Sequence, residues 1–124
     1  MEGRREGARR PESFPRRYRL GGNRNYRYVY RKGKSYPSRS LVLIHLRSRD
    51  LKIGFSVSGK VGNAVTRNRI RRWLREDVRR LRYRMKCGKY VFIARKGIAD
   101  VPHEALTREL DRLLEKARLL KEEV

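Results

Sequence analysis

Arginine and asparagine side chains recur in one stretch of this sequence at the spacing of an α-helix. One face of such a helix would present residues three or four positions apart: Asn68, Arg72, Arg75 and Arg79. The opposite face would present an apolar stripe: Ile70, Trp73, Leu74, Val78 and Leu81. Eight arginines lie between Arg67 and Arg82, and only Glu76 and Asp77 dilute them. A solvated helix face carries mixed charges, whereas closely spaced like charges repel, so this pattern favours a helix that binds a polyanion.

Tyrosines gather in a second stretch that could do chemistry. Tyr26 and Tyr30 are four residues apart, so their rings share one face of a predicted short helix, with Val29 between them and arginines nearby. If exposed, the rings would stack on single-stranded bases, at ~1–3 kcal/mol per base, while the arginines bind phosphates. If buried, they would belong to the core. The sequence leaves both interpretations open, and tyrosine rather than phenylalanine slightly favours a surface that is apolar but wet.

The charge balance of the whole chain predicts a partner of the same kind. The 124 residues include 35 Lys and Arg against 13 Asp and Glu, which gives a formal charge of +22. Such a charge is typical of proteins that bind nucleic acid or an anionic membrane surface. Asp50 is the only acidic residue between Phe14 and Arg75, whereas residues 103–124 are nearly balanced. We therefore expect one end of the protein to bind the ligand and the other to be ordinary surface.

Targeting signals and disulfides are not expected. No apolar run approaches the ~20 residues that span a bilayer, and no signal-peptide pattern opens the chain. The single cysteine, Cys87, excludes an intrachain disulfide and fits a reducing cytoplasm. We interpret Cys87 as a small apolar residue at the start of a strand.

No pattern predicts catalysis by side chains or a metal site. The sequence holds no defensible Ser/His/Asp or Cys/His arrangement and no Walker-type phosphate loop. Glu76 and Asp77 are adjacent, so on a helix their side chains point about 100° apart and would not easily share an ion. His45 and His103 are far apart in the sequence. These observations favour a binding protein over an enzyme.

Periodicity and punctuation predict the elements that position these residues. We expect strands at Lys34–Pro37, Leu41–Leu46, 51–57 and 90–94. We expect helices over Asn23–Lys32, with Asn23 as N-cap and Gly33 as stop, and from an Asn63 N-cap onward. A last helix within 103–124 carries a leucine-rich stripe: Leu106, Leu110, Leu113, Leu114, Ala117 and Leu120. We call the helix that follows Asn63 the arginine helix. Asp77 falls inside its apolar arc, where it pairs with Arg80 or lies at the edge of the stripe.

The domain organisation follows from the same pattern. Residues 1–17 are arginine-rich with almost nothing to bury, which predicts a basic, disordered arm. Residues 18–124 suffice for one domain with a modest core. Strands followed by helix, strand and helix predict an α/β (α+β) sandwich with helices packed on one sheet.

The loop and first turns of the arginine helix resemble the signature of the bacterial ribonuclease P protein subunit. The matching residues are Lys60-Val61-Gly62-Asn63-Ala64-Val65 and then Arg67-Asn68-Arg69-Ile70-Arg71-Arg72. The family's aromatic pair has a counterpart in Tyr26 and Tyr30, followed by Gly33. Residues 53–58 correspond to the strand before the signature, and residues 93–96 to the family's strand-end motif. The resemblance covers roughly Leu20 to Leu120. The chain departs from the family at Gly59, where Lys is common, and in a longer, more basic arm.

This resemblance implies the order αβββαβα, with a four-stranded mixed sheet, three helices and a left-handed crossover around the signature helix. It also implies that the RNA subunit carries the Mg²⁺ ions and hydrolyses the phosphodiester that matures the tRNA 5′ end, so the protein is a non-catalytic subunit without its own cofactor. The residues that it places on the RNA subunit are Lys60, Asn63, Arg67, Asn68, Arg69, Arg71 and Arg72. The residues that it places in a cleft for the 5′ leader of precursor tRNA are Tyr26, Tyr30, Ile44 and Ser56.

Two other functions compete with this prediction. A ribosomal protein would be equally small and basic and would bind ribosomal RNA without a leader cleft. A DNA-binding helix could read bases through Asn68 and its neighbouring arginines. No helix-turn-helix spacing precedes that helix, and paired aromatic residues suit single strands better than duplex.

Overall fold

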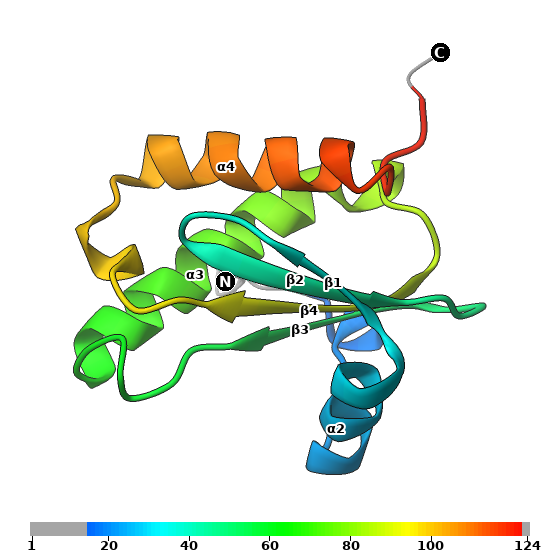
Figure 1. Cartoon of the computed structure of the whole chain (residues 1–124), viewed down its shortest axis with the longest axis horizontal. Coiled ribbons are helices and arrows are strands. Elements are labelled where there is room, and N and C mark those ends of the chain that lie inside the picture. The colour runs from blue at the N-terminus through cyan, green and yellow to red at the C-terminus, as the bar shows by residue number, and fades with distance from the viewer. Residues whose placement is uncertain (1–14, 123–124) are drawn as a thin grey trace, which may run out of the picture.

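The computed structural model describes residues 15–122, and the greater part of the predicted arm, residues 1–14, lies outside them. The elements are η1 (Arg16–Tyr18), α2 (Asn23–Lys32), β1 (Lys34–Pro37), β2 (Leu41–Leu46), β3 (Leu51–Ser56), α3 (Ala64–Leu81), η2 (Arg82–Arg84), β4 (Gly88–Ala94), η3 (Ile98–Asp100) and α4 (His103–Lys116), where η marks a 3-10 helix. The α-helices and strands follow the order αβββαβα, as predicted. Helix α2 covers one face of the sheet, and α3 and α4 cover the other (Figure 1).

The sheet is mixed and its last strand lies inside it. The spatial order is β1-β2-β4-β3, with β2 antiparallel to β1 and β4, and β3 parallel to β4. Parallel neighbours need a long crossover, which α3 supplies. Along the outer side of β3, Arg19 forms a parallel bridge with Ile53, and the Leu20 backbone N–H donates to the Ile53 carbonyl at 2.9 Å. The segment before α2 therefore lines the β3 edge.

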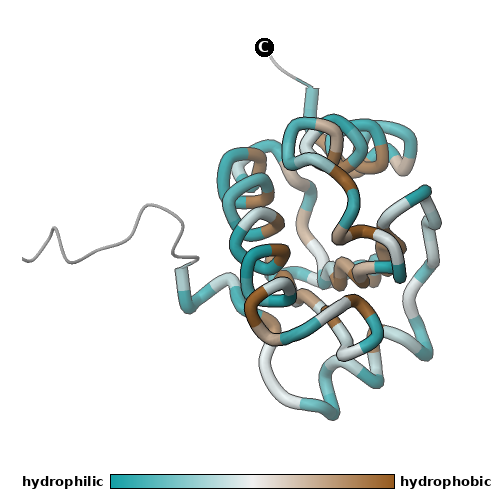
Figure 2. Tube along the Cα trace, turned by 90° about the vertical axis from the view of Figure 1, so that its left-hand side faces the viewer, coloured by the Kyte–Doolittle hydropathy of each residue, from teal (hydrophilic) through white to brown (hydrophobic). Residues whose placement is uncertain are grey.

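Apolar side chains form two clusters, one on each face of the sheet. The larger lies between the sheet and the helices α3 and α4, and it includes most of both predicted stripes: Ile70, Leu74, Val78, Leu81, Leu106, Leu110, Leu113 and Leu114 are buried. The predicted stripe residue Trp73 is partly buried against this cluster. Figure 2 shows the hydrophobic residues of the helices turned toward the interior. The smaller cluster lies under α2 and contains Leu20, Val29 and Val91.

The ends of the helices confirm some predicted caps and correct others. The Asn63 side chain accepts a hydrogen bond from the Thr66 backbone N–H at 2.9 Å and caps α3, as predicted. Asn23 is instead the first residue of α2, because the cap position belongs to Gly22, whose φ of 79° suits glycine. Gly33 ends α2 as predicted, and its N–H donates to the Val29 carbonyl at 2.7 Å.

Two further expectations change, and the predicted boundary between arm and domain can be located in the structure. Cys87 is exposed rather than an apolar filler, because it precedes the first buried residue of β4. Helix α4 ends at Lys116, so the predicted stripe residues Ala117 and Leu120 follow the helix and are only partly buried. The predicted boundary between arm and domain falls inside η1, which extends the described structure to residues before Tyr18. Among residues 15–122, no helix is both long and apolar enough to cross a bilayer.

Candidate nucleic-acid interface

The loop before α3 is fixed to the first turn of that helix. Besides the Asn63 cap, the Arg67 Nε donates to the Gly62 carbonyl at 3.1 Å. A side chain at position 62 would meet Thr66 at 3.0 Å, so glycine permits this close approach. Lys60 remains exposed at the tip of the loop. The Arg67 side chain is therefore held at this corner, and Lys60 lies exposed beside it.

The arginines of α3 are divided between two flanks of the helix. Arg71 donates to the Asn68 side chain at 3.1 Å and to the Val57 carbonyl at 3.2 Å, so it is held toward the end of β3. Arg69 instead lies over the ring of Trp73, with 5.2 Å between its guanidinium carbon and the ring centroid. Arg72 is exposed. The seven residues predicted to bind the RNA subunit therefore share one end of α3 without forming one flat face.

A cleft of about 420 Å³ lies where α2, the end of β3 and α3 meet. Its lining residues are Asn23, Tyr26, Arg27, Tyr30, Phe55, Ser56, Val57, Ser58 and Arg71. The structure therefore brings Tyr26, Tyr30 and Ser56 together, as the resemblance implied, and adds Arg71 to them. Ile44 does not line this cleft, because it packs beneath α2 against the smaller cluster.

The two tyrosines of the cleft differ in burial. Tyr30 is 40% exposed, and Tyr26 is half-buried and packs against the smaller cluster. Their rings meet edge to face, with centroids 6.3 Å apart. The Tyr26 ring lies against Gly54, where a Cβ atom would be only 2.6 Å from the Tyr26 Cζ. Tyr26 thus packs against the core and also lines the cleft. It combines the buried and the exposed positions that the sequence left open as alternatives.

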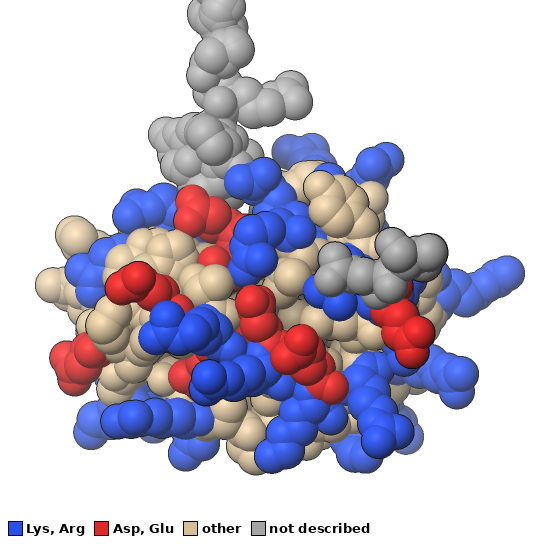
Figure 3. Space-filling view, turned by 90° about the horizontal axis from the view of Figure 1, so that it is seen from above, with Lys and Arg blue, Asp and Glu red and all other residues tan. Residues whose placement is uncertain are grey.

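The guanidinium groups of Arg19, Arg71 and Arg75 lie close together at this interface. Burial lowers the pKa of Arg75, and the nearby Arg19 and Arg71 guanidiniums lower it further. Burial also raises the pKa of Tyr26, while a hydrogen bond from the Phe55 backbone and the neighbouring arginines oppose that rise. Such crowding destabilises the free protein, and a bound polyanion would relieve it. Figure 3, which views the α4 side, shows acidic and basic residues interleaved there instead.

The structure also joins polar residues that are far apart in sequence. Asp77 is 3% exposed, and its carboxylate lies 3.2 Å from the His103 Nε2 and accepts from the Thr107 hydroxyl at 3.0 Å. Glu76 lies 3.9 Å from the same imidazole, so one ligand atom from each of these two carboxylates and His103 falls within 4.8 Å of the others. Sequence reasoning missed this group because α4 begins 26 residues after Asp77. Since the Asp77 oxygens already have partners on α4, we interpret this group as a link between α3 and α4. Asp77 therefore contacts His103 and Thr107 rather than the Arg80 that the sequence offered as a partner.

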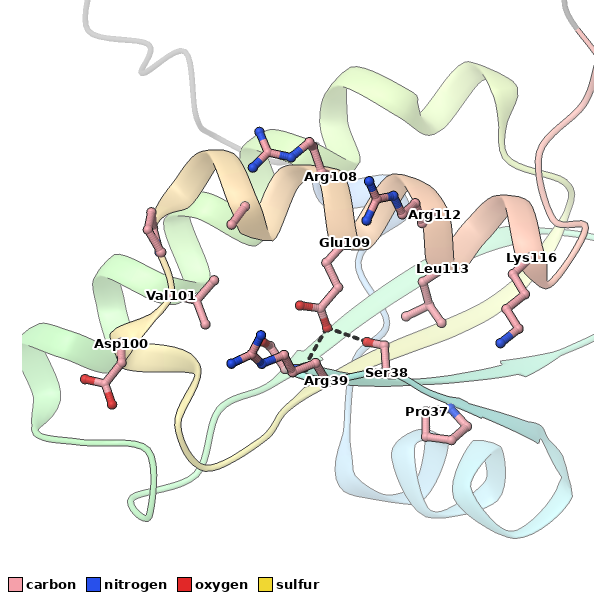
Figure 4. A pocket seen from close by; sticks show the side chains of 13 residues that line it. Pro37, Ser38, Arg39, Asp100, Val101, Arg108, Glu109, Arg112, Leu113 and Lys116 are labelled. Carbon is pink, nitrogen blue, oxygen red and sulfur yellow. Dashed lines mark hydrogen bonds between the residues drawn. The ribbon is translucent and has the colours of Figure 1, made fainter.

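A second hollow, of about 520 Å³, lies between α4 and the turn that joins β1 to β2. In it the Glu109 carboxylate accepts from the Ser38 hydroxyl at 2.5 Å and from the Ser40 backbone N–H at 2.6 Å (Figure 4). Arg108 and Arg112 line its rim. Glu109 therefore fastens the β1–β2 turn to α4, on the side of the sheet away from α2.

Fold and site together define the class of this protein: a small, basic α/β protein whose cleft and helix have the chemistry of a polyanion binder. A family model described as Ribonuclease P matches residues 14–118. The chain is 37% identical over 105 residues to the ribonuclease P protein component of Streptococcus pyogenes serotype M5 (strain Manfredo), covering 83% of this chain and 88% of that protein. The chain therefore belongs to the ribonuclease P protein family, whose members are components of the ribonuclease P complex.

Solved structures agree with this assignment. The Staphylococcus aureus RNase P protein superposes with a TM-score of 0.80 at 29% identity, covering 84% of this chain and 98% of that one. The Thermotoga maritima RNase P protein superposes with a TM-score of 0.73 at 28% identity, covering 79% and 96%. Family membership supports neither the ribosomal nor the DNA-binding alternative.

Proposed function

We propose that this chain binds the catalytic RNA subunit of ribonuclease P and the 5′ leader of precursor tRNA, and so supports endonucleolytic maturation of the tRNA 5′ end in the cytoplasm. The observation that carries the proposal is the cleft in which Arg71, from the arginine helix, lies beside Tyr26 and Tyr30. One cleft thus combines a phosphate-binding cation with stacking rings. That combination suits an unpaired strand, because bases stacked within a duplex offer no free face to a tyrosine.

Each part of the interface has a separate task in this proposal. The exposed loop and first turns of α3 bind phosphates of the RNA subunit through Lys60 and Arg72. In the cleft, Tyr30 stacks on a leader base while Arg71 binds a phosphate; its hydrogen bond to Val57 pre-organises it. The leader is held along a fixed path, which positions the scissile bond of precursor tRNA against the RNA subunit.

Hydrolysis belongs to the RNA subunit in this proposal. Among residues 15–122, the two histidines have structural surroundings: His103 contacts Asp77, and burial lowers the pKa of His45. The Mg²⁺ ions are carried by RNA, and this chain supplies binding and orientation. Purified protein should therefore not cut precursor tRNA; cleavage by a nuclease-free preparation without added RNA would contradict the proposal.

Two exposed tyrosines of α2 allow a matched test of the cleft. Tyr30 lines the cleft and is 40% exposed, whereas Tyr28 is 43% exposed and is absent from the cleft lining. Tyr30→Ala should weaken binding of precursor tRNA to the reconstituted holoenzyme by ~1–3 kcal/mol, the value of one base stack. Tyr28→Ala should leave it unchanged, and mature tRNA, which has no leader, should bind equally well to all three proteins. Equal losses for precursor and mature tRNA would end the leader assignment.

The arginine helix has its own control. Arg72→Gln should weaken assembly with the RNA subunit whatever substrate is present, whereas Arg112→Gln, an equally exposed position on α4, should not. Titration of labelled RNA subunit with each variant measures this. If both variants assemble like the wild type, Arg72 does not bind the RNA subunit.

A further inference from the structure

A stack of tyrosine and arginine side chains lies at the far end of α3 from the signature loop. The Arg17 and Arg82 guanidinium carbons lie 5.0 and 4.8 Å from the centroid of the Tyr18 ring. Arg82 also lies 5.8 Å from the centroid of the Tyr83 ring. We call Arg17, Tyr18, Arg82 and Tyr83 the tyrosine–arginine stack. It joins η1 to η2, which are far apart in sequence.

Two properties of this stack indicate a ligand. Tyr83 is 73% exposed, the highest value for an aromatic side chain among residues 15–122. The buried Arg82 Nη1 has no hydrogen-bond partner, and no carboxylate in the described part of the chain forms an ion pair with Arg82. Desolvated guanidinium donors are rarely left unpaired, so a phosphate oxygen would satisfy this one. An exposed ring beside an underused cation is the chemistry that grips an unpaired nucleotide.

A continuous row of arginines connects the leader cleft to this stack. Arg71, Arg75 and Arg79 of α3 and its C-cap residue Arg82 are spaced by four, four and three residues, so they follow one side of the helix. Arg75 is close enough to Tyr26 and Arg71 at one end, and to Arg19 at the other, for their charges to act on it. Arg19 lies on the β3 edge, next to Tyr18. The row therefore runs beside the sheet edge from the cleft to Tyr18 and Tyr83.

We propose that an RNA strand leaving the leader cleft continues along this arginine row and stacks an unpaired base on Tyr83. This inference rests on the proposed function, because it assigns a second contact to the same leader. Arg71 and Arg82 are separated by eleven residues of helix, or about 16 Å at ~1.5 Å per residue. At the ~3.4 Å per nucleotide of a stacked strand, this distance corresponds to about five nucleotides. The second contact thus requires a leader about five nucleotides longer than one that only fills the cleft.

The test is the dependence of affinity on leader length. Holoenzyme reconstituted with the RNA subunit is titrated with precursor tRNAs whose leaders lengthen one nucleotide at a time. For the wild type, affinity should rise as the cleft fills and rise again about five nucleotides further upstream. Tyr83→Ala should lose the second rise, by about 5-fold to about 140-fold, and bind short leaders normally. Tyr83→Phe, which keeps the ring, should retain the second rise.

Controls separate this inference from folding and from the proposed function. Tyr28→Ala removes a similarly cation-flanked exposed tyrosine and should retain both rises, and melting curves should match the wild type because both rings are exposed. The inference is overturned if the affinity of the Tyr83→Ala variant equals that of the wild type at every leader length. It is also overturned if the affinity is lowered equally at every length, a result that would assign Tyr83 to the RNA subunit. Tyr30→Ala tests the proposed leader function independently of Tyr83. If this variant binds precursor tRNA of every leader length like the wild type, the proposed leader function fails as well.

Discussion

Substitution of Gly54 by alanine tests how closely the leader cleft is fitted to the sheet beneath it. Gly54 is buried in β3, and the half-buried ring of Tyr26 lies where its side chain would be. An alanine Cβ would lie against the Tyr26 hydroxyl and 2.6 Å from the Tyr26 Cζ, so the side chain must retreat by at least about 0.8 Å to reach the 3.4 Å of ordinary contact. The ring also packs on the smaller core cluster, so it cannot swing away freely.

The magnitude follows from this geometry. Overfilling a packed site typically costs ~1–3 kcal/mol of unfolding free energy, and we expect Gly54→Ala to fall in that range. In a Tyr26→Ala background the obstructing ring is absent. There, alanine at position 54 should be neutral, or stabilising by up to ~1 kcal/mol because it restricts the unfolded chain. The coupling energy between the two positions should therefore be ~1–4 kcal/mol, and favourable to the double variant.

Urea denaturation of the wild type, both single variants and the double variant measures this coupling. Binding of precursor tRNA to holoenzyme carrying Gly54→Ala supplies the functional readout, because a displaced Tyr26 should weaken leader binding while mature tRNA binds normally. Additive unfolding free energies would refute the argument, since they would mean that Gly54 and Tyr26 do not compete for space. A Gly54→Ala variant as stable as the wild type would do the same.

Other predictions concern the helix ends, the buried carboxylate and the phosphate contacts. Asn63→Ala removes the cap of α3 and should cost ~1 kcal/mol of unfolding free energy in urea denaturation; no loss would mean that Asn63 does not stabilise the helix end. Burial raises the pKa of Asp77 above its unfolded value of ~3.9, so the folded protein binds the proton more tightly than the unfolded chain does. This contribution to the free energy of unfolding is complete below pH ~3.9 and is lost as the pH rises through the pKa of the folded state. Asp77→Asn should flatten the pH dependence of unfolding above about pH 4, and an unaltered profile would contradict this. Affinity for the RNA subunit should fall steeply between ~50 and ~200 mM salt, and Arg72→Gln should reduce the slope of log affinity against log salt by ~0.7–0.9; an unchanged slope would remove Arg72 from the phosphate contacts.

The elements of this fold were largely predictable because their signals are local. The Asn63 cap and the leucine stripe of α4 depend on neighbours within a few positions. The cap of α2 was misplaced by one residue because Asn23 resembles a cap, whereas the left-handed backbone of Gly22 sets the start. The spatial order of the strands was not predicted, since no local signal places β4 between β2 and β3.

The site was predictable to the extent that its residues share an element. Tyr26 and Tyr30 were paired correctly because they are one helical turn apart. Arg71 in the cleft and the contact of Asp77 with His103 depend on the packing of separate elements, which spacing along the chain does not encode. Ile44 was assigned to the cleft by resemblance, and in this structure the body of α2 covers it.

The position of β4 inside the sheet has a consequence for how the chain folds during synthesis. Within the part that the structure describes, β2 can pair only with β1, and β3 only with the short segment at Arg19, until residues 88–94 have left the ribosome. The arginine-rich α3 precedes β4, so it emerges before the sheet on which it packs is complete. Pairings between distant segments form slowly, and a chain waiting for them exposes apolar surface and unpaired strand edges. During translation, the apolar face of α3 therefore has no complete sheet to pack on until β4 has been made.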